Sequence, residues 1–439
     1  MRIVSVTAGA GGMFCGSCMR DNTLAAALVA LGHDALLVPT YTPLTTDETS
    51  VAAPRVFLGG VNVYLQQHAW LFRHAPRFVD ALLNGNRLLR WAGKFVGKTD
   101  YSKMGGLTVS MLQGTHGKQA KEVGKLVDWL KADVRPQVVL MTNALLSGCV
   151  PAIRRELGVP VLTTLQGDDV FLDELPERDR RACIELIRAN DESTAAYLVT
   201  SRNYGEYMSR YLGIDHGKMH VVLPGINTRG HAGPTPRPAD RPPTVGFFSR
   251  FAPEKGFHNL VEAYIRLRRV PGMPVVKLRV GGWLGEKYRA YFDENVRRLV
   301  DAGLAGDLEH VVCPDLPSKV RFFQSIDVLS VPTAFREPKG LYVLEAWANG
   351  VPVVQPNVGS FPELVERTGG GLLFEQNNAG DLTAALRELL TDLPRAADLG
   401  RKGYVGLTQT LTARHMAEAT LNILNRYVSP AERLEPTAV

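Results

Sequence analysis

The sequence predicts an α/β protein made of two doubly wound domains, and three observations support this fold class. The chain has 439 residues, which is long for one domain and enough for two hydrophobic cores. Short β-branched runs alternate with helix-forming segments along most of its length, as in parallel sheets whose strands are joined by helices. Residues 229–243 contain five prolines and few large apolar side chains, which predicts a linker between the two domains.

The composition is typical of a globular protein. Hydrophobic residues make up 45% of the chain and charged residues 21%, and no apolar run is long enough to span a membrane. The N-terminal segment MRIVSVTAGAGG lacks the apolar core of a signal peptide. Five cysteines are few for this length and argue for a reducing compartment without a disulfide framework. We therefore expect a cytoplasmic protein.

The net charge of +6 at pH 7 is mildly basic. Such a charge suits phosphate-bearing ligands or an anionic membrane surface, and it falls short of the basic stripe of a nucleic-acid-binding protein. We expect no nucleic-acid partner.

The first strand-helix-strand unit occupies the N-terminus. Residues 2–7 predict a strand, the glycine-rich turn 9–12 follows it, and a helix is expected to begin near Asp21 or Asn22, either of which can cap it. Ligands bind at the carboxyl ends of strands in such folds. The turn lacks the spacing of a dinucleotide fingerprint. Cys15 and Cys18 form a C-x-x-C pair with no second pair to complete a metal site, so we expect small loop residues, with redox or metal chemistry as the alternative.

Residues 328–354, VLSVPTAFREPKGLYVLEAWANGVPVV, carry the clearest chemical pattern. A strand ends at Pro332, a polar loop carries Glu337, and a helix is predicted to begin near Gly340 or Leu341. The free N–H groups at its start make an anion site. Glu337 lies just before this site and Glu345 lies inside the helix. Because carboxylates repel a phosphate, we expect them to bind the hydroxyl groups of sugar or ribose rings attached to it. The pattern therefore predicts a nucleotide-sugar site, and the alternative is an amphipathic helix with two solvated glutamates.

The motif E-P-K-G-L-Y-V-L-E within this stretch resembles the signature of the retaining glycosyltransferases with the GT-B fold, the family 4 type also described as glycosyl transferases group 1. The family includes sucrose, trehalose and lipid mannosyl transferases. The resemblance implies two Rossmann-like domains that face each other across a cleft. It also implies that Glu337 contacts the donor sugar and that Glu345 contacts the ribose.

A second motif belongs to the same resemblance. Arg250, Lys255 and Gly256 lie on a strand-to-helix loop and are similar to the G-R-x…K-G element of the family, whose Arg and Lys hold the donor diphosphate. Their charges would stabilise the leaving group in place of a divalent metal. The resemblance therefore implies catalytic roles for Arg250, Lys255 and Glu337, with no metal and no cofactor.

The resemblance also implies further contacts, on both domains. The expected donor-binding residues are Gly12, Gln166, Arg250, Lys255, Cys313, Leu316, Glu337, Lys339, Gly340, Leu341 and Glu345. The expected acceptor-side residues are Gly11, Gly12, Met13 and Asp168. Gln166 occupies the position where the family usually has His, and its amide cannot hold a proton near neutral pH. Asp168 and Asp169 are alternatively helix caps.

The expected domain boundaries follow from the proline-rich segment and from the resemblance to the GT-B family. We expect an acceptor-side domain at 1–228, the linker at 229–243, a nucleotide-sugar-binding domain at 244–410, and a disordered tail at 429–439. The amphipathic segment 411–428 is expected to form the final helix, which in GT-B enzymes packs back on the first domain.

Residues 59–118 interrupt the alternation. Between 68 and 103 they hold aromatic and basic side chains against two aspartates: Trp70, Phe72, Phe78, Trp91 and Phe95, with Arg73, Arg77, Arg87, Arg90, Lys94, Lys98 and Lys103, against Asp80 and Asp100. This composition predicts either a surface that meets an anionic membrane or a lipid-linked acceptor, or a helical excursion with buried aromatics.

The sequence thus predicts a retaining glycosyltransferase, most simply a hexosyltransferase. Its donor would be a UDP-, GDP- or ADP-sugar, and its acceptor a glycan, a lipid-linked sugar or a small molecule. The alternatives are an α-glucan synthase that elongates a polymer, and a non-catalytic protein that binds a nucleotide sugar. The replacement at Gln166 is the feature that favours the last.

Overall fold

The computed structural model describes residues 1–9, 15–59, 62–63, 66–67 and 104–429. The chain divides into two compact units. Unit 1 comprises Met1–Leu223 and Arg414–Val439, and unit 2 comprises Pro224–Ala413. The predicted acceptor-side residues Gly11, Gly12 and Met13, and the aromatic and basic stretch 68–103, lie outside the described residues.

Unit 1 is built on a parallel sheet of six strands in the order β2-β1-β3-β4-β5-β6. The strands are β1 (Arg2–Ala8), β2 (Asp34–Thr40), β3 (Val138–Met141), β4 (Val161–Leu165), β5 (Ala196–Val199) and β6 (Met219–Val221). Beyond β2, single parallel bridges at Ala52 and Phe57 extend the sheet. The chain proceeds from β1 toward β2 on one side and from β1 toward β3 on the other, which makes the space between β1 and β3 a topological switch point.

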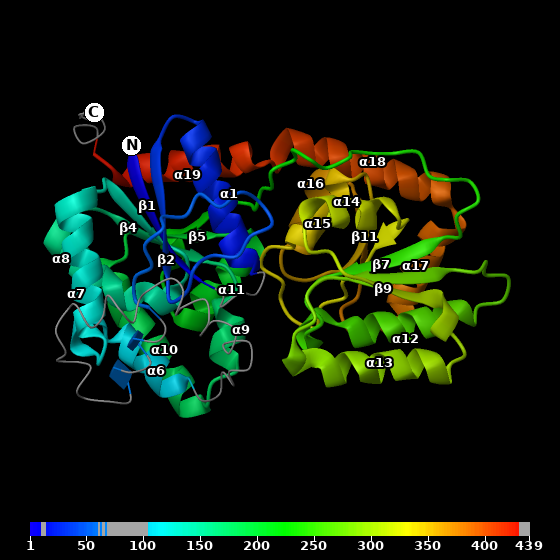
Figure 1. Ribbon diagram of the computed structural model, residues 1–439, viewed down its shortest axis with the longest axis horizontal. Coiled ribbons are helices and arrows are strands. Elements are labelled where there is room, and N and C mark those ends of the chain that lie inside the picture. The colour runs from blue at the N-terminus through cyan, green and yellow to red at the C-terminus, as the bar shows by residue number, and fades with distance from the viewer. Residues whose placement is uncertain (10–14, 60–61, 64–65, 68–103, 430–439) are drawn as a thin grey trace. The chain divides into compact units, whose positions relative to one another are not determined.

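Helices cover both faces of this sheet, because alternate strand residues point to opposite sides. Ile3 packs into one core with residues of α1 (Gly16–Ala30) and of the C-terminal helix α19 (Ala413–Tyr427), so these two helices share a face (Figure 1). Val4 and Val6 pack into a second core on the opposite side. The other α-helices whose bounds the structure describes in this unit are α6 (Gly105–Leu112), α7 (Ala120–Trp129), α8 (Val150–Leu157), α9 (Asp168–Asp173), α10 (Glu177–Asn190) and α11 (Arg202–Leu212).

Unit 2 is also doubly wound around six parallel strands, in the order β12-β11-β10-β7-β8-β9. Its strands are β7 (Thr244–Phe248), β8 (Lys277–Gly281), β9 (Leu308–Val311), β10 (Val328–Leu329), β11 (Val353–Pro356) and β12 (Gly371–Phe374). Its helices are α12 (Phe257–Arg268), α13 (Arg289–Asp301), α14 (Leu316–Gln324), α15 (Leu341–Ala348), α16 (Phe361–Thr368), α17 (Ala379–Thr391) and α18 (Leu393–Thr410). The switch point lies between β7 and β10. The two sheets confirm the predicted fold class.

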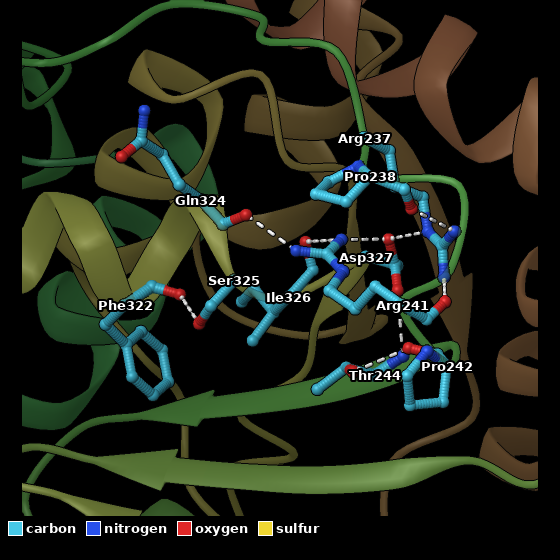
Figure 2. Close-up of polar contacts among 10 residues, drawn as sticks. All are labelled: Arg237, Pro238, Arg241, Pro242, Thr244, Phe322, Gln324, Ser325, Ile326 and Asp327. Carbon is cyan, nitrogen blue, oxygen red and sulfur yellow. Dashed lines mark hydrogen bonds and ion pairs between the residues drawn. The ribbon is translucent and has the colours of Figure 1, made fainter.

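The proline-rich segment 229–243 is fastened to unit 2. Figure 2 shows Asp327, just before β10, between two arginines of this segment. Asp327 Oδ1 accepts from Arg237 Nε at 2.8 Å and from Arg241 Nη2, while Oδ2 accepts from the backbone N–H of Thr244 at 2.8 Å. Arg241 Nη1 also donates to the carbonyl of Gln324 at 2.7 Å. These bonds tie the segment to the amino ends of β7 and β10.

The structure corrects the predicted start of the first helix. α1 begins at Gly16, with Cys15 as its N-cap residue, rather than near Asp21 or Asn22. Both side chains are buried within α1. Asp21 accepts a hydrogen bond from Thr7, and Asn22 accepts one from the backbone N–H of Val51. They are therefore tertiary anchors rather than caps. Among the described residues, no helix is long and apolar enough to cross a membrane.

Candidate functional site

The loops that follow β7 and β10 meet at the switch point of unit 2. The β7 loop ends in the 3₁₀ turn Pro253–Lys255 and in Gly256, whose φ of +73° opens α12. A Cβ at Gly256 would lie 1.8 Å from the carbonyl oxygen of Pro332, so glycine permits the close approach of the two loops. The sequence could not show this approach, because it depends on β7 and β10 being neighbours in the sheet.

Lys255 and Glu337 form a buried ion pair across these loops. Lys255 Nζ lies 2.5 Å from Glu337 Oε2, and the two side chains are 11% and 5% exposed. The ammonium also lies 4.6 Å from the centre of the Phe335 ring. Two residues that were expected to act together are thus in direct contact. Burial strengthens their interaction, since a low local dielectric screens charge poorly.

Glu337 is held ionised. Burial alone would raise its pKa, but the charges of Lys255 and Lys339 and hydrogen bonds from Lys255 and the backbone N–H of Gly340 lower the pKa to about 2. Its Oε1 accepts from the backbone N–H groups of Lys339 and Gly340, both at 3.3 Å, and Oε2 accepts from the Tyr342 hydroxyl at 3.4 Å. A carboxylate in this setting accepts hydrogen bonds at neutral pH and does not donate a proton.

The helix that follows begins as the sequence predicts. Gly340 is the N-cap of α15 with φ +60° and ψ +39°, and Leu341 is the first helical residue. No side chain caps this end by a hydrogen bond. Lys339 is buried directly before the helix start. The first turn of α15 and the Lys339 ammonium therefore give this loop a positive character that suits a phosphate group.

Glu345 is paired with a residue that the sequence analysis did not single out. Lys319 Nζ on α14 lies 2.7 Å from Glu345 Oε1 on α15, and both side chains are buried. Of the two cations on α14, Arg321 is exposed, whereas Lys319 is buried together with Val320, Phe322 and Phe323. A single lysine on the buried face of a helix was the available signal, since such a group requires a partner.

The other predicted donor residues of unit 2 are placed as follows. Arg250 Nη2 donates to Glu254 Oε1 at 3.0 Å, within its own loop. Cys313 lies in the loop after β9, and burial raises the pKa of its thiol, so it is mainly protonated at neutral pH. Leu316 is the first residue of α14, which Asp315 caps by accepting from the Ser318 N–H.

In unit 1, Gln166 and Asp168 are buried at the carboxyl end of β4. Gln166 Nε2 donates to the carbonyl and the hydroxyl of Thr142 at 2.9 and 3.1 Å. Asp168 Oδ1 accepts from the N–H of Ala144 at 2.6 Å, and Oδ2 from the N–H of Gln166 at 2.9 Å. Asp168 is the first residue of α9, whose N-cap is Gly167. Both side chains therefore tie together the loops that follow β3 and β4.

The cysteine pair lies at the start of α1. Cys15 is the N-cap residue of α1, and the Cys18 thiol donates to the carbonyl of Ala8 at 2.8 Å. Among the residues that the structure describes, no three His, Cys, Asp or Glu side chains gather as a metal site would require.

The comparisons with known proteins agree with this architecture. The family described as glycosyl transferases group 1 matches residues 234–405, and the glycosyl transferase 4-like domain matches residues 22–225. The chain is 24% identical over 415 residues to the glycogen synthase of Mycobacterium tuberculosis, covering 91% of this chain and 88% of that protein. It is 32% identical over 262 residues to the D-inositol 3-phosphate glycosyltransferase of Paenarthrobacter aurescens, covering 56% of this chain and 62% of that protein.

Solved structures show the same fold. Sucrose-phosphate synthase from Thermosynechococcus elongatus superposes with a TM-score of 0.70 at 18% identity, covering 97% of this chain and 99% of that one. Anabaena HepE, solved in complex with UDP and glucose, gives a TM-score of 0.66 at 15% identity, covering 97% and 100%. With two matching families that span most of the chain and two doubly wound units, the protein belongs to the GT-B glycosyltransferases.

Proposed function

We propose that this glycosyltransferase moves a hexose from a nucleotide-sugar donor to a carbohydrate or lipid-linked acceptor, with retention at the anomeric carbon. The observation that carries the proposal is the Lys255–Glu337 pair beside the start of α15. Each group suits one feature of such a donor. The helical N–H groups suit the diphosphate, the carboxylate suits the sugar hydroxyls, and the cation suits the charge that develops on the leaving group.

In this proposal the side chains of unit 2 divide the donor among them. Lys255 and Arg250 face the diphosphate and stabilise the charge that grows on it as the glycosidic bond breaks. Glu337, ionised with a pKa of about 2, accepts hydrogen bonds from the sugar hydroxyls. Glu345 binds the ribose, and Lys319, whose Nζ lies 2.7 Å from Glu345 Oε1, orients the Glu345 carboxylate. Lys339 and the N–H group of Leu341 bind phosphate oxygens.

Retention is proposed to proceed by front-face transfer. The donor phosphate oxygen takes the acceptor proton, so the protein need not supply a nucleophile. The charges of Arg250 and Lys255 take the place of a divalent metal, and we propose that neither a metal nor a cofactor is required. At the Gln166 position, the amide donates hydrogen bonds and takes no part in proton transfer.

A panel of UDP-, GDP- and ADP-sugars tests the donor proposal. Thermal stabilisation identifies the nucleotide, donor hydrolysis then shows catalysis, and the anomeric configuration of the product, measured by NMR, decides between retention and inversion. The nucleotide complex of HepE and the mannosyltransferase relatives with GDP-mannose in their names make UDP and GDP the first choices. Binding without turnover of any donor would favour a non-catalytic nucleotide-sugar-binding protein.

A second candidate is elongation of an α-glucan, which the likeness to a glycogen synthase over 91% of the chain favours. The two candidates differ in acceptor. An elongating enzyme extends maltooligosaccharides or glycogen by many sugars, whereas a single-transfer enzyme adds one sugar to a smaller acceptor.

We propose further that residues 68–103 bring the enzyme to an anionic membrane or a lipid-linked acceptor. The support is their sequence, in which seven Arg or Lys side chains stand against two Asp among five Trp and Phe side chains. Each basic residue near an anionic surface is worth about 1 kcal/mol. Flotation with anionic liposomes at low and high salt tests this, and binding that does not depend on salt or anionic lipid would contradict it.

A further inference from the structure

Arg20 is a buried arginine that the donor chemistry does not use. It lies on α1, is 1% exposed, and its Nη1 donates to Asp21 Oδ1 at 3.2 Å. Within the part of the chain that the structure describes, its Nε and Nη2 atoms are buried and have no hydrogen-bond partner. Burial lowers the pKa of this guanidinium, and Asp21 opposes that change. Buried polar groups in proteins are nearly always partnered, so two such atoms on one side chain require a reason.

The two nitrogens lie on one edge of the guanidinium. Nε–H and Nη2–H point the same way, in the side-on arrangement that holds both oxygens of a carboxylate or two oxygens of a phosphate. Arg20 therefore keeps one complete bidentate edge.

Asp21 cannot use this edge, because its oxygens are already occupied. Oδ1 accepts from Arg20 and, at 3.4 Å, from Gln166 Nε2. Oδ2 accepts from the hydroxyls of Thr7, at 2.8 Å, and Thr142. A carboxylate offers about four lone-pair positions, and four donors fill them. Asp21 thus acts as an anchor that fixes the orientation of the guanidinium.

The position of this cluster in the sheet is that of a ligand site. Thr7 lies near the carboxyl end of β1, Thr142 directly follows β3, and Gln166 directly follows β4. Asp21 therefore joins the strands on both sides of the unit 1 switch point, where doubly wound sheets bind their ligands.

We propose that Arg20 binds an oxyanion of the acceptor, a phosphate or a carboxylate, with Nε and Nη2 donating to two of its oxygens. The acceptor is then an anionic sugar or polyol, and Asp21, Thr7, Thr142 and Gln166 form the frame that holds Arg20 in place. This inference rests on the proposed function only in assigning the oxyanion to the acceptor.

Arg20→Lys tests the inference, because lysine keeps the charge and loses the planar edge. The matched control is Arg237→Lys, which changes an arginine that Asp327 holds in unit 2. With ¹⁵N-arginine labelling, the Nε–H signal that disappears in R20K is that of Arg20. In separate titrations with inorganic phosphate and with acetate, we expect this signal to shift until it saturates. The position of the Arg237 Nε–H signal should not change. An Arg20 signal that does not move with either anion overturns the proposal.

Acceptor selectivity gives the second readout. For the wild type, kcat/KM should be on the order of 10²-fold higher for a sugar phosphate or uronic acid than for the neutral sugar, because a site built around a charged group discriminates strongly against analogues that lack it. The ratio should fall in R20K, because lysine keeps the charge but loses the bidentate contact, and it should stay high in R237K. A ratio is insensitive to the fraction of folded enzyme, so an unchanged ratio in R20K overturns the proposal.

The two proposals fail separately. If no nucleotide sugar is turned over but the Arg20 signal titrates, the oxyanion site is supported and the proposed function is wrong. If donors are turned over but the signal does not titrate, the proposed function is supported and the oxyanion site is wrong.

Discussion

Replacing Lys255 by methionine removes one charge from the buried pair at the unit 2 switch point. Methionine keeps an unbranched side chain of similar length, so the change isolates the ammonium group. Glu337 Oε2 then loses a partner at 2.5 Å. The carboxylate keeps the two backbone N–H groups at 3.3 Å and the more distant charge of Lys339.

The expected loss of stability follows from the pKa of Glu337. Lowering this pKa from 4.5 to about 2 corresponds to about 3 kcal/mol of native-state stabilisation at neutral pH. Because the folded-state pKa is depressed, this contribution is complete above pH 4.5 and is lost as the pH falls from about 4.5 to about 2. Removing one partner of a buried pair costs roughly 3–5 kcal/mol. We therefore expect the free energy of unfolding of K255M at pH 7 to be about 3 kcal/mol lower than that of the wild type, and the pKa of Glu337 to be raised.

K255M should also lose activity. Losing a charge that acts on the leaving group should lower the turnover of the donor by on the order of 10²- to 10³-fold. Urea unfolding at pH 7 measures the first effect, and donor hydrolysis by the fraction that remains folded measures the second.

Glu337→Gln and the double variant complete a cycle. Since each single change leaves a buried group without its counter-charge, the K255M/E337Q protein should lose less stability than the two single changes together. Full activity in K255M would refute the assignment of Lys255 to the leaving group. Strictly additive losses of stability would refute the ion pair.

Three further predictions concern other parts of the enzyme. Glu345→Gln should raise the dissociation constant of the donor more than it lowers turnover at saturating donor, because ribose is bound equally in the ground and transition states. Lys319→Met should also raise this dissociation constant. A loss of turnover without weaker donor binding in E345Q would mean that the roles of Glu337 and Glu345 are reversed. EDTA should leave activity intact, and loss that Mg²⁺ or Mn²⁺ restores would contradict leaving-group stabilisation by Arg and Lys. Asp327→Asn should lower the free energy of unfolding by about 3 kcal/mol, since Arg237 and Arg241 lose their shared carboxylate, without changing nucleotide affinity; wild-type urea stability would refute the proposed anchoring of segment 229–243.

Local sequence was sufficient where one segment contains all the determinants. Residues 337–345 hold the loop carboxylate, the glycine that begins the helix and the second carboxylate, and the structure places each of them as expected: Gly340 is the N-cap of α15 and Leu341 its first residue. Strand-helix alternation likewise predicted two doubly wound sheets, because parallel strands require helical connections.

Local sequence was insufficient where a partner lies far along the chain. The arginines of segment 229–243 were expected to belong to a linker, and only the fold brings Asp327 between them (Figure 2). Lys319 became part of the site because α14 and α15 place it 2.7 Å from Glu345. Asp21 was expected as a cap because Asp favours helix starts, but its partners Thr7 and Thr142 lie on two strands that no local pattern joins.

The two switch points share one arrangement, a buried carboxylate beside a cation, but the carboxylates accept from different hydrogen-bond donors. In each unit a buried carboxylate lies at the switch point of the sheet, between β1 and β3 in unit 1 and between β7 and β10 in unit 2. A cation lies beside each carboxylate: Lys255 beside Glu337, and Arg20 beside Asp21. Glu337 has one charged hydrogen-bond donor, Lys255, and keeps two backbone N–H groups and the Tyr342 hydroxyl, so we propose that it can share this cation with an incoming diphosphate. Asp21 is held mainly by hydroxyl and amide donors, which leaves one edge of Arg20 for another anion. We propose that in both units the carboxylate fixes the cation and that the cation contacts the substrate.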